Sequence, residues 1–559
     1  MTGALRRCRM AAILTALILP GVASARELIV APTGGNFATV VAGVGAAQAG
    51  DTVTVRAGVY NERVSFSRSG SAVAGSITVR GEAGAVLDGT GLSGVGVTIN
   101  NQSYIRVIGF TIRNFKSGNT PMGIDVEGNS SFIQLRNNLI HNIESPNGNA
   151  HGIAFYGTAV TPMTNIVVDG NEIRNCLLGQ SEALVLNGNV DGFVVSRNTV
   201  HDNDNIGIDF IGFEGTGPAG QDQARNGTCV DNVVYNISSA TNPTYGGDRS
   251  ADGIYVDGGR DVVIERNKVD NCDIGIEVAS EHGGRATSNI TVRNNFISRG
   301  YQGNVLMGGY DATRGMAQNV VVVNNTTYQG TFGEIQLQYN CDGITIKNNI
   351  LYARSGQPYV LNGGGNNTNV TVANNIYFGA STGSPGSYPD PAARFVNPLV
   401  VNPPADLHLL GGSPAVNAGI NLGDDPLGQP MSGISDIDGR LRVHAAAIDV
   451  GAHEFGSITG VEPEGAPSAG DLRQNYPNPF NPNTTLEFRV ARPGHVALRI
   501  FDASGRLVRT LFSGVAAAGR RTANWDGRDS RGVPVASGVY LAEFTGPGAH
   551  RIRRMTLVR

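Results

Sequence analysis

Eight short segments in the middle of the chain place acidic, aromatic and amide side chains at matching positions. In order, they read GIDVEG (123–128), GIAFYG (152–157), ALVLNG (183–188), GIDFIG (207–212), GIYVDG (253–258), GIEVAS (275–280), NVLMGG (304–309) and EIQLQY (334–339). Each is typical of a β-strand, in which successive side chains point to opposite faces of a sheet. If the aliphatic residue at the second position points into the core, the third and fifth positions face solvent.

This phase predicts two ladders of outward-facing residues. The third positions hold Asp125, Ala154, Val185, Asp209, Tyr255, Glu277, Leu306 and Gln336, and the fifth positions hold Glu127, Tyr156, Asn187, Ile211, Asp257, Ala279, Gly308 and Gln338. Asp209, Asp257 and Glu277 therefore surround Tyr255 on three successive strands, with Asp209 and Glu277 about 9.6 Å apart at the backbone. Carboxylates on one open sheet repel one another, so a bound cation or a catalytic role explains such a group best.

The segments that follow these strands bring more polar residues to the same region. A long excursion over 213–250 carries Glu214, Asp222, Arg225, Tyr245, Asp248 and Arg249, and the next two turns add Glu281, His282, Arg285, Tyr310, Asp311 and Arg314. Loops of this length in a compact repeat are usually functional or disordered. The alternative is that polar residues simply cover a solvated sheet, and we interpret Asp125 and Glu127, several strands away, in that way.

Nine asparagines recur along the same part of the chain at intervals of 24 to 35 residues. They are Asn138, Asn171, Asn198, Asn232, Asn267, Asn295, Asn325, Asn349 and Asn375. A period of this size indicates a repeat array whose units bury their apolar faces only by stacking. In such a stack the equivalent amides lie on top of one another and hydrogen-bond along the array. The sequence therefore predicts an all-β fold, a parallel β-helix over residues 26–400.

The composition fits an exported, turn-rich protein. The 559 residues include 77 glycines and carry a net charge of −4, which gives no nucleic-acid footprint. Residues 1–25 are typical of a secretory signal peptide, with three arginines, the apolar run AAILTALILP and a small-residue cleavage site at Ala23-Ser24-Ala25. A transmembrane anchor is disfavoured, because the apolar run is about half of the roughly 20 residues that span a membrane.

Four of the five cysteines lie outside the predicted signal peptide. The register of the repeats predicts that these four are free thiols buried in the core. Cys229 lies three residues before Asn232, where other repeats place aliphatic residues. Cys176 and Cys272 share a position on the coil but stand three coils apart, roughly 14 Å at about 4.8 Å per coil. That separation is beyond the reach of a disulfide bond.

The asparagine period ends after Tyr377. Residues 401–456 resemble a C-terminal segment of exported bacterial β-helix proteins, and we expect them to cap the open end of the stack. Residues 457–470 form a linker rich in glycine, proline and alanine, and 471–559 alternate as strands split by turns.

This last domain resembles the Ig-like sorting domains of type IX-type secretion and the Ig-like domain of flagellar hook-capping proteins. Its most specific stretch is Asn475-Tyr476-Pro477-Asn478-Pro479-Phe480. The resemblance implies a role in export or surface attachment, with the secretion machinery as partner.

The coils resemble the pectate-lyase-like right-handed β-helix superfamily, and AGDTVTVRAGVYNERV (49–64) looks like the opening coil of several uronate lyases. That superfamily contains polysaccharide lyases, polygalacturonase-type hydrolases, epimerases and non-enzymatic surface proteins. In its lyases, calcium held by carboxylates neutralises the substrate carboxylate, and a lysine or arginine removes the proton at C5. None of the three lysines here lies on the acidic face, so the resemblance leaves Arg285, Arg314, His282 or Tyr255 as the base.

Polygalacturonase-type hydrolases offer the rival resemblance. Residues 250–254 (Ser-Ala-Asp-Gly-Ile) are similar to their Asn-Thr-Asp-Gly-Ile motif, and 272–276 partly match their Gly-Asp-Asp motif, with Ile274 in place of the second aspartate. The Gly-His-Gly and Arg-x-Lys motifs are missing. Inverting hydrolysis needs two carboxyl groups about 6.5–9.5 Å apart, which Asp209 or Asp257 with Glu277 would provide.

These observations predict a monomeric, carbohydrate-active protein that a Gram-negative bacterium secretes or holds at its cell surface. The predicted activity is that of a calcium-assisted lyase of a uronate-containing polysaccharide. An inverting hydrolase and a non-catalytic glycan-binding protein are the alternatives. The predicted catalytic residues are Glu277, Asp252, Tyr255, His282, Arg285 and Arg314. The predicted substrate-binding residues are Tyr245, Arg225, Arg249, Tyr310, Asp311 and Glu281, and the predicted Ca²⁺ ligands are Asp209, Asp257 and Glu277.

Overall fold

The fold was taken from a computed structural model of the whole chain. The structure describes residues 25–116, 120–145, 148–380, 383–424, 430–433, 435–440, 442, 447–456, 471–473, 475, 480–490, 493–502, 507–517, 519–536, 538–546 and 549–557. The predicted signal peptide through Ser24, the predicted linker 457–470 and residues 476–479 of the Ig-like stretch lie outside the described residues.

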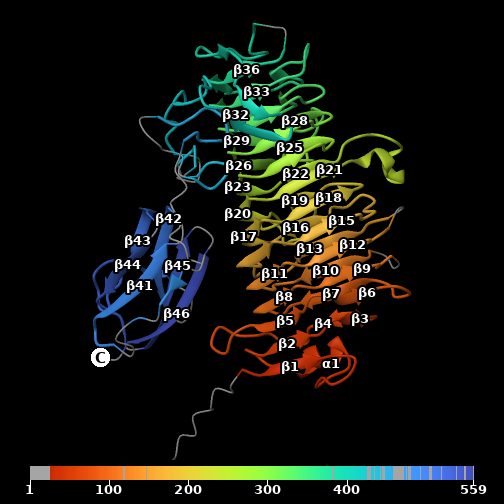
Figure 1. The fold of residues 1–559 in the computed structure, drawn as a ribbon, viewed down its shortest axis with the longest axis vertical. Coiled ribbons are helices and arrows are strands. Elements are labelled where there is room, and N and C mark those ends of the chain that lie inside the picture. The colour runs from red at the N-terminus through yellow and green to blue at the C-terminus, as the bar shows by residue number, and fades with distance from the viewer. Residues whose placement is uncertain are drawn as a thin grey trace, which may run out of the picture.

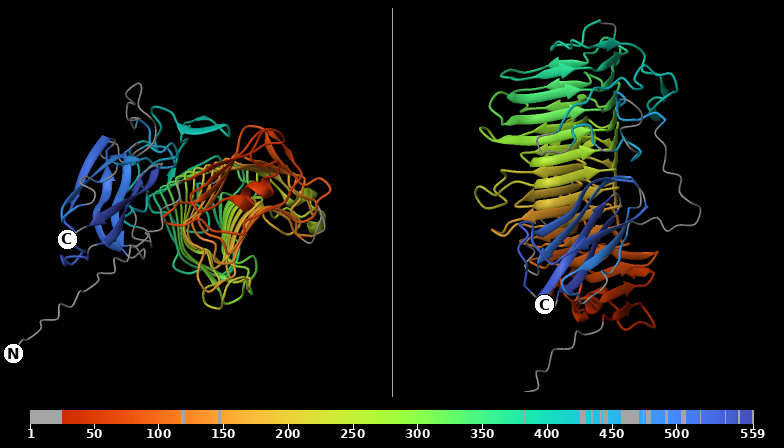
Figure 2. Two further views of the ribbon diagram at one scale, coloured as in Figure 1. Left: turned by 90° about the horizontal axis from the view of Figure 1, so that it is seen from below. Right: turned by 90° about the vertical axis from the view of Figure 1, so that its left-hand side faces the viewer.

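The larger part of the chain is a right-handed parallel β-helix built from three sheets, here called A, B and C (Figures 1 and 2). Each coil contributes a strand to sheet C, then to sheet A, then to sheet B, and every strand pairs in parallel with its equivalent in the next coil. The predicted fold class is therefore confirmed.

The strands of the three sheets have the following bounds. Sheet A consists of β1 (Glu27–Val30), β2 (Thr52–Val55), β5 (Ile77–Gly81), β8 (Ile105–Ile108), β11 (Ile133–Arg136), β14 (Ile166–Asp169), β17 (Asp191–Ser196), β20 (Arg225–Val230), β23 (Arg260–Glu265), β26 (Ala286–Arg293), β29 (Met316–Val323), β32 (Cys341–Lys347) and β35 (Thr371–Ala373). Sheet B consists of β3 (Gly58–Tyr60), β6 (Ala85–Asp88), β9 (Thr111–Arg113), β12 (Leu139–His141), β15 (Glu172–Arg174), β18 (Thr199–Asn203), β21 (Val233–Ile237), β24 (Lys268–Asp270), β27 (Phe296–Ser298), β30 (Thr326–Tyr328), β33 (Ile350–Tyr352), β36 (Ile376–Phe378) and β37 (Arg394–Phe395). Sheet C consists of β4 (Val64–Ser65), β7 (Val95–Asn100), β10 (Met122–Glu127), β13 (His151–Gly157), β16 (Leu184–Gly188), β19 (Ile208–Ile211), β22 (Asp252–Asp257), β25 (Ile274–Ala279), β28 (Gly303–Met307), β31 (Ile335–Leu337) and β34 (Val360–Asn362).

The nine predicted asparagines occupy the turn between sheets A and B and form one continuous hydrogen-bonded ladder. The Nδ2 of Asn232, for example, donates to Oδ1 of Asn267 at 2.9 Å, and the backbone N–H of Asn232 donates to the same oxygen at 2.9 Å. Each Nδ2 also reaches a carbonyl of the preceding coil, as in Asn267 Nδ2 to Cys229 O at 3.0 Å. Asp390 ends the ladder, because its Oδ2 accepts from Nδ2 of Asn375 at 3.1 Å.

The core between the sheets consists of stacked aliphatic side chains, and the cysteine prediction is confirmed. Cys176, Cys229, Cys272 and Cys341 are free and buried. Burial in apolar surroundings raises the pKa of Cys176 to about 12, which keeps this thiol protonated and unreactive.

A short helix that the sequence reading missed closes the N-terminal end of the stack. Helix α1 (Val40–Ala46) begins at Thr39, whose side chain caps it by accepting from the amide of Ala42. Its buried residues Val40 and Val44 join the main core. Gly43 lets the helix approach sheet A closely, since a Cβ there would lie 2.5 Å from Val30 Cγ2.

The described residues of the segment 401–456 lie along the side of the solenoid, against the outer face of sheet B, rather than over its open end. Leu409, Ala415 and Val450 pack on Ile350 and Ile376. The segment contains the antiparallel pair β38 (Val400–Asn402) and β39 (Asp406–Leu409).

Ladder-adjacent asparagines hold this segment in place. Asn324 Nδ2 donates to Asp449 O at 3.1 Å and Asn374 Nδ2 to Ala418 O at 3.0 Å. The predicted end cap is therefore a side cover, because the apolar outer face of sheet B at these coils needs burial.

The predicted excursion 213–250 is in fact two loops separated by a full return to the stack. Strands β20 and β21 occupy its centre. The first loop, 212–224, connects sheet C to sheet A. The second, 238–251, connects sheet B to sheet C and contains the 3₁₀ turns η1 (Ser239–Thr241) and η2 (Pro243–Tyr245). The two loops therefore flank sheet C at opposite ends of its strands.

The C-terminal domain is a small antiparallel β-sandwich with its own core. One sheet contains β40 (Asp471–Leu472), β41 (Thr484–Val490) and β44 (Gly519–Trp525), and the other contains β43 (Leu507–Ala516), β42 (Gly494–Asp502), β45 (Gly538–Gly546) and β46 (Ala549–Leu557). Trp525, Phe488 and Phe544 are buried in the core between them. Among the described residues of the whole chain, no helix is long and apolar enough to cross a membrane.

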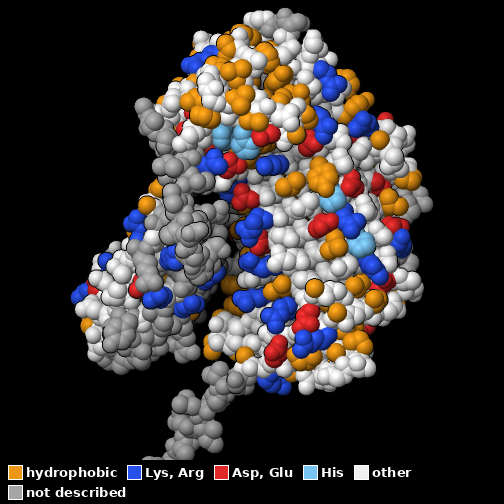
Figure 3. Space-filling model, viewed as in Figure 1, with side chains coloured by type: hydrophobic (Ala, Val, Ile, Leu, Met, Phe, Trp, Pro, Cys, Tyr) orange, Lys and Arg blue, Asp and Glu red, His pale blue; other side chains and the backbone are white. Residues whose placement is uncertain are grey.

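Charged side chains of both signs are interspersed over the face of the solenoid seen in Figure 3. Ion pairs between coils produce such a pattern, and examples are Arg136 with Asp169 at 2.9 Å and Arg266 with Asp231 at 2.9 Å.

Replacing one ladder asparagine should destabilise the fold more than replacing an exposed one. Asn267→Ala leaves the buried amide of Asn232 and the carbonyl of Cys229 without partners, so we expect a loss of about 3 kcal/mol in the free energy of unfolding. Asn129→Ala, at an exposed turn, should change it by less than about 0.5 kcal/mol. The midpoints of urea denaturation measure both, and equal midpoints for the two variants would contradict the ladder's structural role.

Candidate active site

The outer face of sheet C presents the first predicted ladder in the predicted order. Asp209 pairs with Tyr255, and Tyr255 with Glu277, on successive strands. The intervening aliphatic residues Ile254 and Val256 are fully buried in the core. The predicted strand phase is therefore confirmed, and the acidic residues share one wall of the solenoid.

The second ladder is interrupted at the point where the first loop leaves the sheet. Glu127, Tyr156, Asn187 and Ile211 pair as predicted. Ile211 then forms an antiparallel bridge with Gly258 rather than pairing with Asp257. The loop that starts at Gly212 pulls the strand end aside, so Asp257 does not continue the row.

Asp252 and Glu277 form a hydrogen-bonded carboxyl pair on adjacent strands. Asp252 is 2% exposed and Glu277 is 7% exposed. Two carboxyl groups in contact must share a proton, because two buried negative charges at this distance repel strongly. Burial raises the pKa of Glu277 to about 7, and burial together with the charge of Glu277 raises the pKa of Asp252 well above its usual range. The amide of Gln338, oriented by its surroundings, donates to Glu277 Oε1 at 3.3 Å.

Asp209 lies beside this pair and is 2% exposed. Burial, followed by the charges of Glu182 and Asp257, raises its pKa well above the ordinary value. One oxygen of Asp209 and one of Asp252 are buried without any hydrogen-bond partner. Unpartnered buried carboxylate oxygens are costly, so each marks a place where a ligand or cation would be stabilising. We call Asp209, Asp252, Asp257 and Glu277 the acidic centre.

The predicted calcium ligands do not form one ligand set. Among the described residues, Asp257 instead has ligand atoms within 4.8 Å of those of Glu214 and His282. His282 Nε2 lies 3.0 Å from Glu214 Oε1, and Asp257 Oδ1 accepts the backbone N–H of Glu281 at 2.9 Å. The prediction of Asp209, Asp257 and Glu277 as a single set is wrong, because Tyr255 separates Asp209 from Glu277 and Asp257 turns toward the loops.

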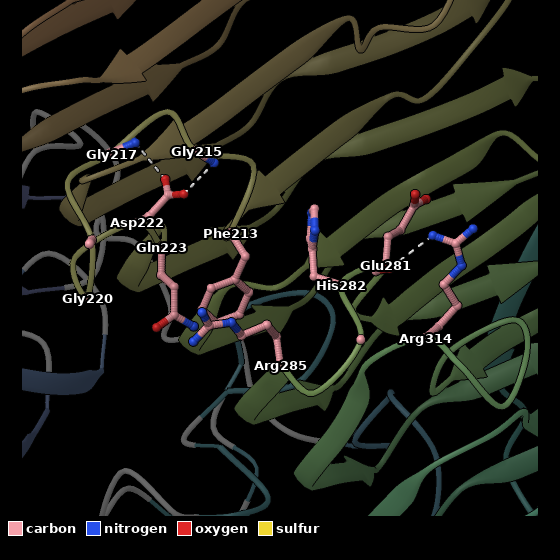
Figure 4. A pocket seen from close by; sticks show the side chains of 12 residues that line it. Phe213, Gly215, Gly217, Gly220, Asp222, Gln223, Glu281, His282, Arg285 and Arg314 are labelled. Atoms are coloured by element: carbon pink, nitrogen blue, oxygen red, sulfur yellow. Dashed lines mark hydrogen bonds between the residues drawn. The ribbon is translucent and has the colours of Figure 1, made fainter.

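A cavity of about 820 Å³ opens beside Asp257, between the first loop and the turns after β25 and β28. Figure 4 shows its lining residues, with Phe213 and Arg285 on one side and His282, Glu281 and Arg314 on the other. Asp222 shapes the loop wall, since its carboxylate accepts from the backbone N–H of Gly215 at 2.6 Å and of Gly217 at 2.7 Å.

The predicted arginines 285 and 314 both line this cavity. The Arg285 guanidinium lies 5.3 Å from the ring centre of Phe213, and that of Arg314 lies 4.3 Å from Tyr310. Arg314 Nη1 donates to the carbonyl of Glu281 at 3.2 Å. Asp311 is a partly exposed loop residue that accepts from the backbone N–H of Thr313 at 2.7 Å. These cations face the cavity and suit the binding of anionic groups.

The remaining predicted substrate-binding residues are divided between the site and the scaffold. Tyr245, on the second loop, accepts from Asn205 Nδ2 at 3.1 Å and lies close enough to Glu182 and Asp252 for their charges to raise its pKa further than burial alone. Arg249 pairs with the buried Asp273 at 2.8 Å and stacks on Tyr301, so it anchors the second loop.

Arg225 does not face the site, and its prediction as a substrate-binding residue is wrong. It is buried at the start of β20, where Nη2 donates to Asn189 Oδ1 at 2.9 Å. Its Nη1 donates to the carbonyl of Gln223 at 3.0 Å, so this guanidinium supports the base of the first loop.

Tyr255 is buried between the two acidic strands at 5% exposure. Burial and the charges of Asp257 and Glu277 raise its pKa well above that of an ordinary phenol. It therefore keeps its proton and is a hydrogen-bond donor in this site.

Sequence reasoning did not assign Glu182 to the site and took His151 for a turn residue, but both lie on the outer side of sheet C. Both precede the first aliphatic residue of their strands, one position outside the six-residue windows that defined the ladders. His151 is 3% exposed and Glu182 is 9% exposed. Extending each window by two residues toward the N-terminus would have found them.

Comparisons with known proteins place the chain in a family. Residues 245–388 match the model of a right handed beta helix region, and residues 481–547 match that of the FlgD Ig-like domain. YwoF of Bacillus subtilis (strain 168), an uncharacterized protein, is 36% identical over 348 residues, which are 59% of this chain and 74% of YwoF. The chain belongs to the right-handed β-helix family that includes YwoF.

Solved structures with a similar course of the chain include two polysaccharide lyases. The pectate lyase Pel9A is 16% identical with a TM-score of 0.43, over 78% of this chain and 97% of that chain. The PL6 family polysaccharide lyase Pedsa3628 from Pseudopedobacter saltans is 16% identical with a TM-score of 0.39, over 64% of this chain and 85% of that chain.

The raised pKa of Glu277 predicts that the metal-free protein loses stability as the pH rises. An unfolded glutamate ionises near pH 4.5, whereas Glu277 in the folded chain holds its proton up to about pH 7. Between these values the folded state binds more protons than the unfolded state, so the free energy of unfolding falls with increasing pH, by an amount on the order of 3 kcal/mol for this group. Glu277→Gln should flatten the slope between pH 5 and 7 in thermal unfolding with chelator present.

Glu82→Gln, which removes a partly exposed partner of Arg56, is the control and should leave the slope unchanged. A slope for Glu277→Gln equal to that of the unmodified chain would show that Glu277 ionises normally in the fold.

Proposed function

We propose that the protein is a carbohydrate-active enzyme, a polysaccharide lyase that acts on a uronate-containing polymer along the outer face of sheet C. One observation carries the proposal. Buried carboxyl groups with unpartnered oxygens, on Asp209 and Asp252, lie on an open sheet face beside a cavity lined by Arg285 and Arg314.

The shape of the site favours an extended polymer over a compact metabolite. Polar and aromatic side chains continue along successive strands of sheet C, from Tyr156 through Asp209 and Tyr255 to Gln338. The loops 212–224 and 238–251 rise at opposite ends of these strands and form two walls. A linear chain laid along the stack would therefore contact equivalent positions on several coils.

A divalent cation such as Ca²⁺ fits the donor atoms of the acidic centre. Carboxylate oxygens are the ligands that Ca²⁺ prefers, and the unpartnered oxygens of Asp209 and Asp252 are free to serve as such. The imidazole of His282 suits a transition metal better, so we assign calcium to Asp209 and Asp252 rather than to the set of Asp257, Glu214 and His282. When bound, the cation would neutralise the substrate carboxylate and so acidify the adjacent C–H bond.

The chain's own residues supply binding and proton donation around that bond. Arg285 and Arg314 face the cavity, where they would pair with further uronate carboxylates of the polymer. Tyr255 and the protonated pair of Asp252 and Glu277 are hydrogen-bond donors, which suits them to binding sugar oxygens of the polymer.

The shared proton also favours a second candidate, a glycoside hydrolase. A carboxyl group kept protonated near neutral pH is what a general acid requires, and Glu277 has a pKa of about 7. A hydrolase would use the pair Asp252 and Glu277 as acid and Asp209 as the base that activates water.

Export to the cell surface or the medium completes the proposal. The N-terminal segment 1–25 would direct the chain out of the cytoplasm, and the Ig-like domain would serve as a sorting or attachment module of the secretion machinery. We expect the protein to act as a monomer, because each solenoid carries the whole site.

Purified protein incubated with pectate, alginate and glycosaminoglycans should release unsaturated uronides, detected by their ultraviolet absorbance. Chelator should suppress the release and Ca²⁺ should restore it. Asp209→Asn removes a carboxylate from the acidic centre, so kcat/KM should fall at least about 100-fold.

Asp342→Asn, at a partly exposed aspartate on sheet A, is the matched control and should retain activity. New reducing ends without the absorbance would identify the hydrolase. Binding to the glycans without any turnover would contradict both enzymes and indicate a glycan-binding surface protein.

A further inference from the structure

Tyr156, His151 and Glu182 form a second constellation on sheet C, beside the acidic centre. Tyr156 and His151 lie at the two ends of strand β13, and Glu182 precedes β16 on the next coil. Strand β13 is two coils from β19, which carries Asp209, or about 9.6 Å along the stack.

The hydrogen bonds of these residues run in one direction. Tyr156 Oη lies 2.8 Å from His151 Nε2. His151 Nδ1 lies 3.1 Å from the backbone carbonyl of Glu182 and 3.4 Å from its carboxylate Oε2. Nδ1 faces only acceptors and therefore carries the ring proton, so Nε2 is the acceptor of the Tyr156 hydroxyl proton.

In a catalytic arrangement the residue that contacts substrate reaches the surface and the residues that support it are buried, and these three residues differ in exposure in this way. His151 is 3% exposed and Glu182 is 9% exposed, whereas Tyr156 is only partly buried and reaches the open face. The Tyr156 ring packs on the apolar outer patch formed by Met122, Ala154, Val185 and Ile211. Because its proton is directed at His151, the hydroxyl has lone pairs left to accept from a ligand on the outer face of sheet C.

This arrangement joins a hydroxyl, a base that accepts its hydrogen bond and a residue that orients the base. A phenol has a high pKa, which burial and neighbouring carboxylates raise further in Tyr156, but a hydroxyl activated by an adjacent base does not need a low pKa of its own. Burial lowers the pKa of His151 to about 4, so the ring is neutral and its Nε2 accepts the hydrogen bond of the Tyr156 hydroxyl.

We propose that Tyr156 is the catalytic base of the lyase, that His151 accepts its proton, and that Glu182 is the positioning residue that fixes the His151 ring. The inference rests on the proposed function and supplies the base that the sequence did not reveal. Glu182 is also the strongest charged neighbour of Asp209, so the constellation and the acidic centre meet at this residue.

The proton transfers balance without any external reagent. Tyr156 passes its hydroxyl proton to His151 Nε2, and the phenolate oxygen takes the proton from C5 of the uronate. The C5 electron pair forms the C4=C5 double bond while the bond from C4 to the glycosidic oxygen breaks. That oxygen takes the proton from Tyr156, and His151 returns its own proton to Tyr156.

Asp125 adds a polar group on the far side of Tyr156. It is 5% exposed, and one of its oxygens has no hydrogen-bond partner. Asn187, on the next strand, also has an unpartnered oxygen. These two acceptors would hold sugar hydroxyl groups, so Asp125 is not the plain surface residue that the sequence suggested.

Tyr156→Phe should lower kcat on the active uronate polymer about 10²–10⁴-fold and change KM less than threefold, because the phenyl ring keeps the packing and loses only the hydroxyl. Glu182→Gln should lower kcat with little effect on KM. Tyr352→Phe, at a partly exposed tyrosine of sheet B, is the matched control and should retain most of kcat. An active Tyr156→Phe variant would overturn the inference and leave the proposed function standing.

A second measurement does not depend on the polysaccharide. An aryl sulfonyl fluoride reacts with a phenol whose proton a neighbouring base accepts, and fluoride leaves. Peptide mapping should show Tyr156 labelled about tenfold faster than Tyr310, although Tyr310 is 50% exposed, and His151→Gln should remove this preference. Labelling of Tyr156 no faster than Tyr310 would overturn the inference even if no glycan substrate is found.

Discussion

The asparagine ladder is the interaction on which the rest of this structure depends. Each ladder oxygen accepts from the side-chain and backbone N–H of the preceding coil, as Asn267 does from Asn232, so the height and phase of each coil are set by its neighbour. A slip of one residue would turn every outward side chain of sheet C into the core. The ladder therefore decides which side chains meet on the outer face, although none of its members lies there.

Because the asparagine ladder fixes the phase of the coils, it also explains how several carboxyl groups come together on one face. Asp209, Asp252 and Glu277 are placed by strands that stack for reasons of core packing, and their mutual repulsion is relieved by shared protons rather than by nearby cations. The loops 212–224 and 238–251 then enclose this stretch of sheet from both sides. Stability and function thus oppose each other at the acidic centre, which is typical of functional sites.

The fold and the placement of the acidic ladder could be predicted from the sequence. The fold follows from the period of the asparagines, and the ladder follows from the alternation of inward and outward residues along each strand. Strand phase alone put Asp209, Tyr255 and Glu277 on one wall. Pairing was not predictable in the same way: the contact of Asp252 with Glu277 depends on side-chain rotamers across strands. The prediction for Arg225 was wrong because strand β20 was not recognised. Its sequence, RNGTCV, contains Gly and Asn, which are typical of a loop.

All of these roles require that the polymer binds along the outer face of sheet C. A crystal structure of the Glu277→Gln variant with a uronate oligosaccharide and Ca²⁺ tests this most directly. We expect sugar density along sheet C between Tyr156 and Glu277, with the ion on carboxylates of the acidic centre. Sugar bound to another wall of the solenoid, with sheet C empty, would contradict it.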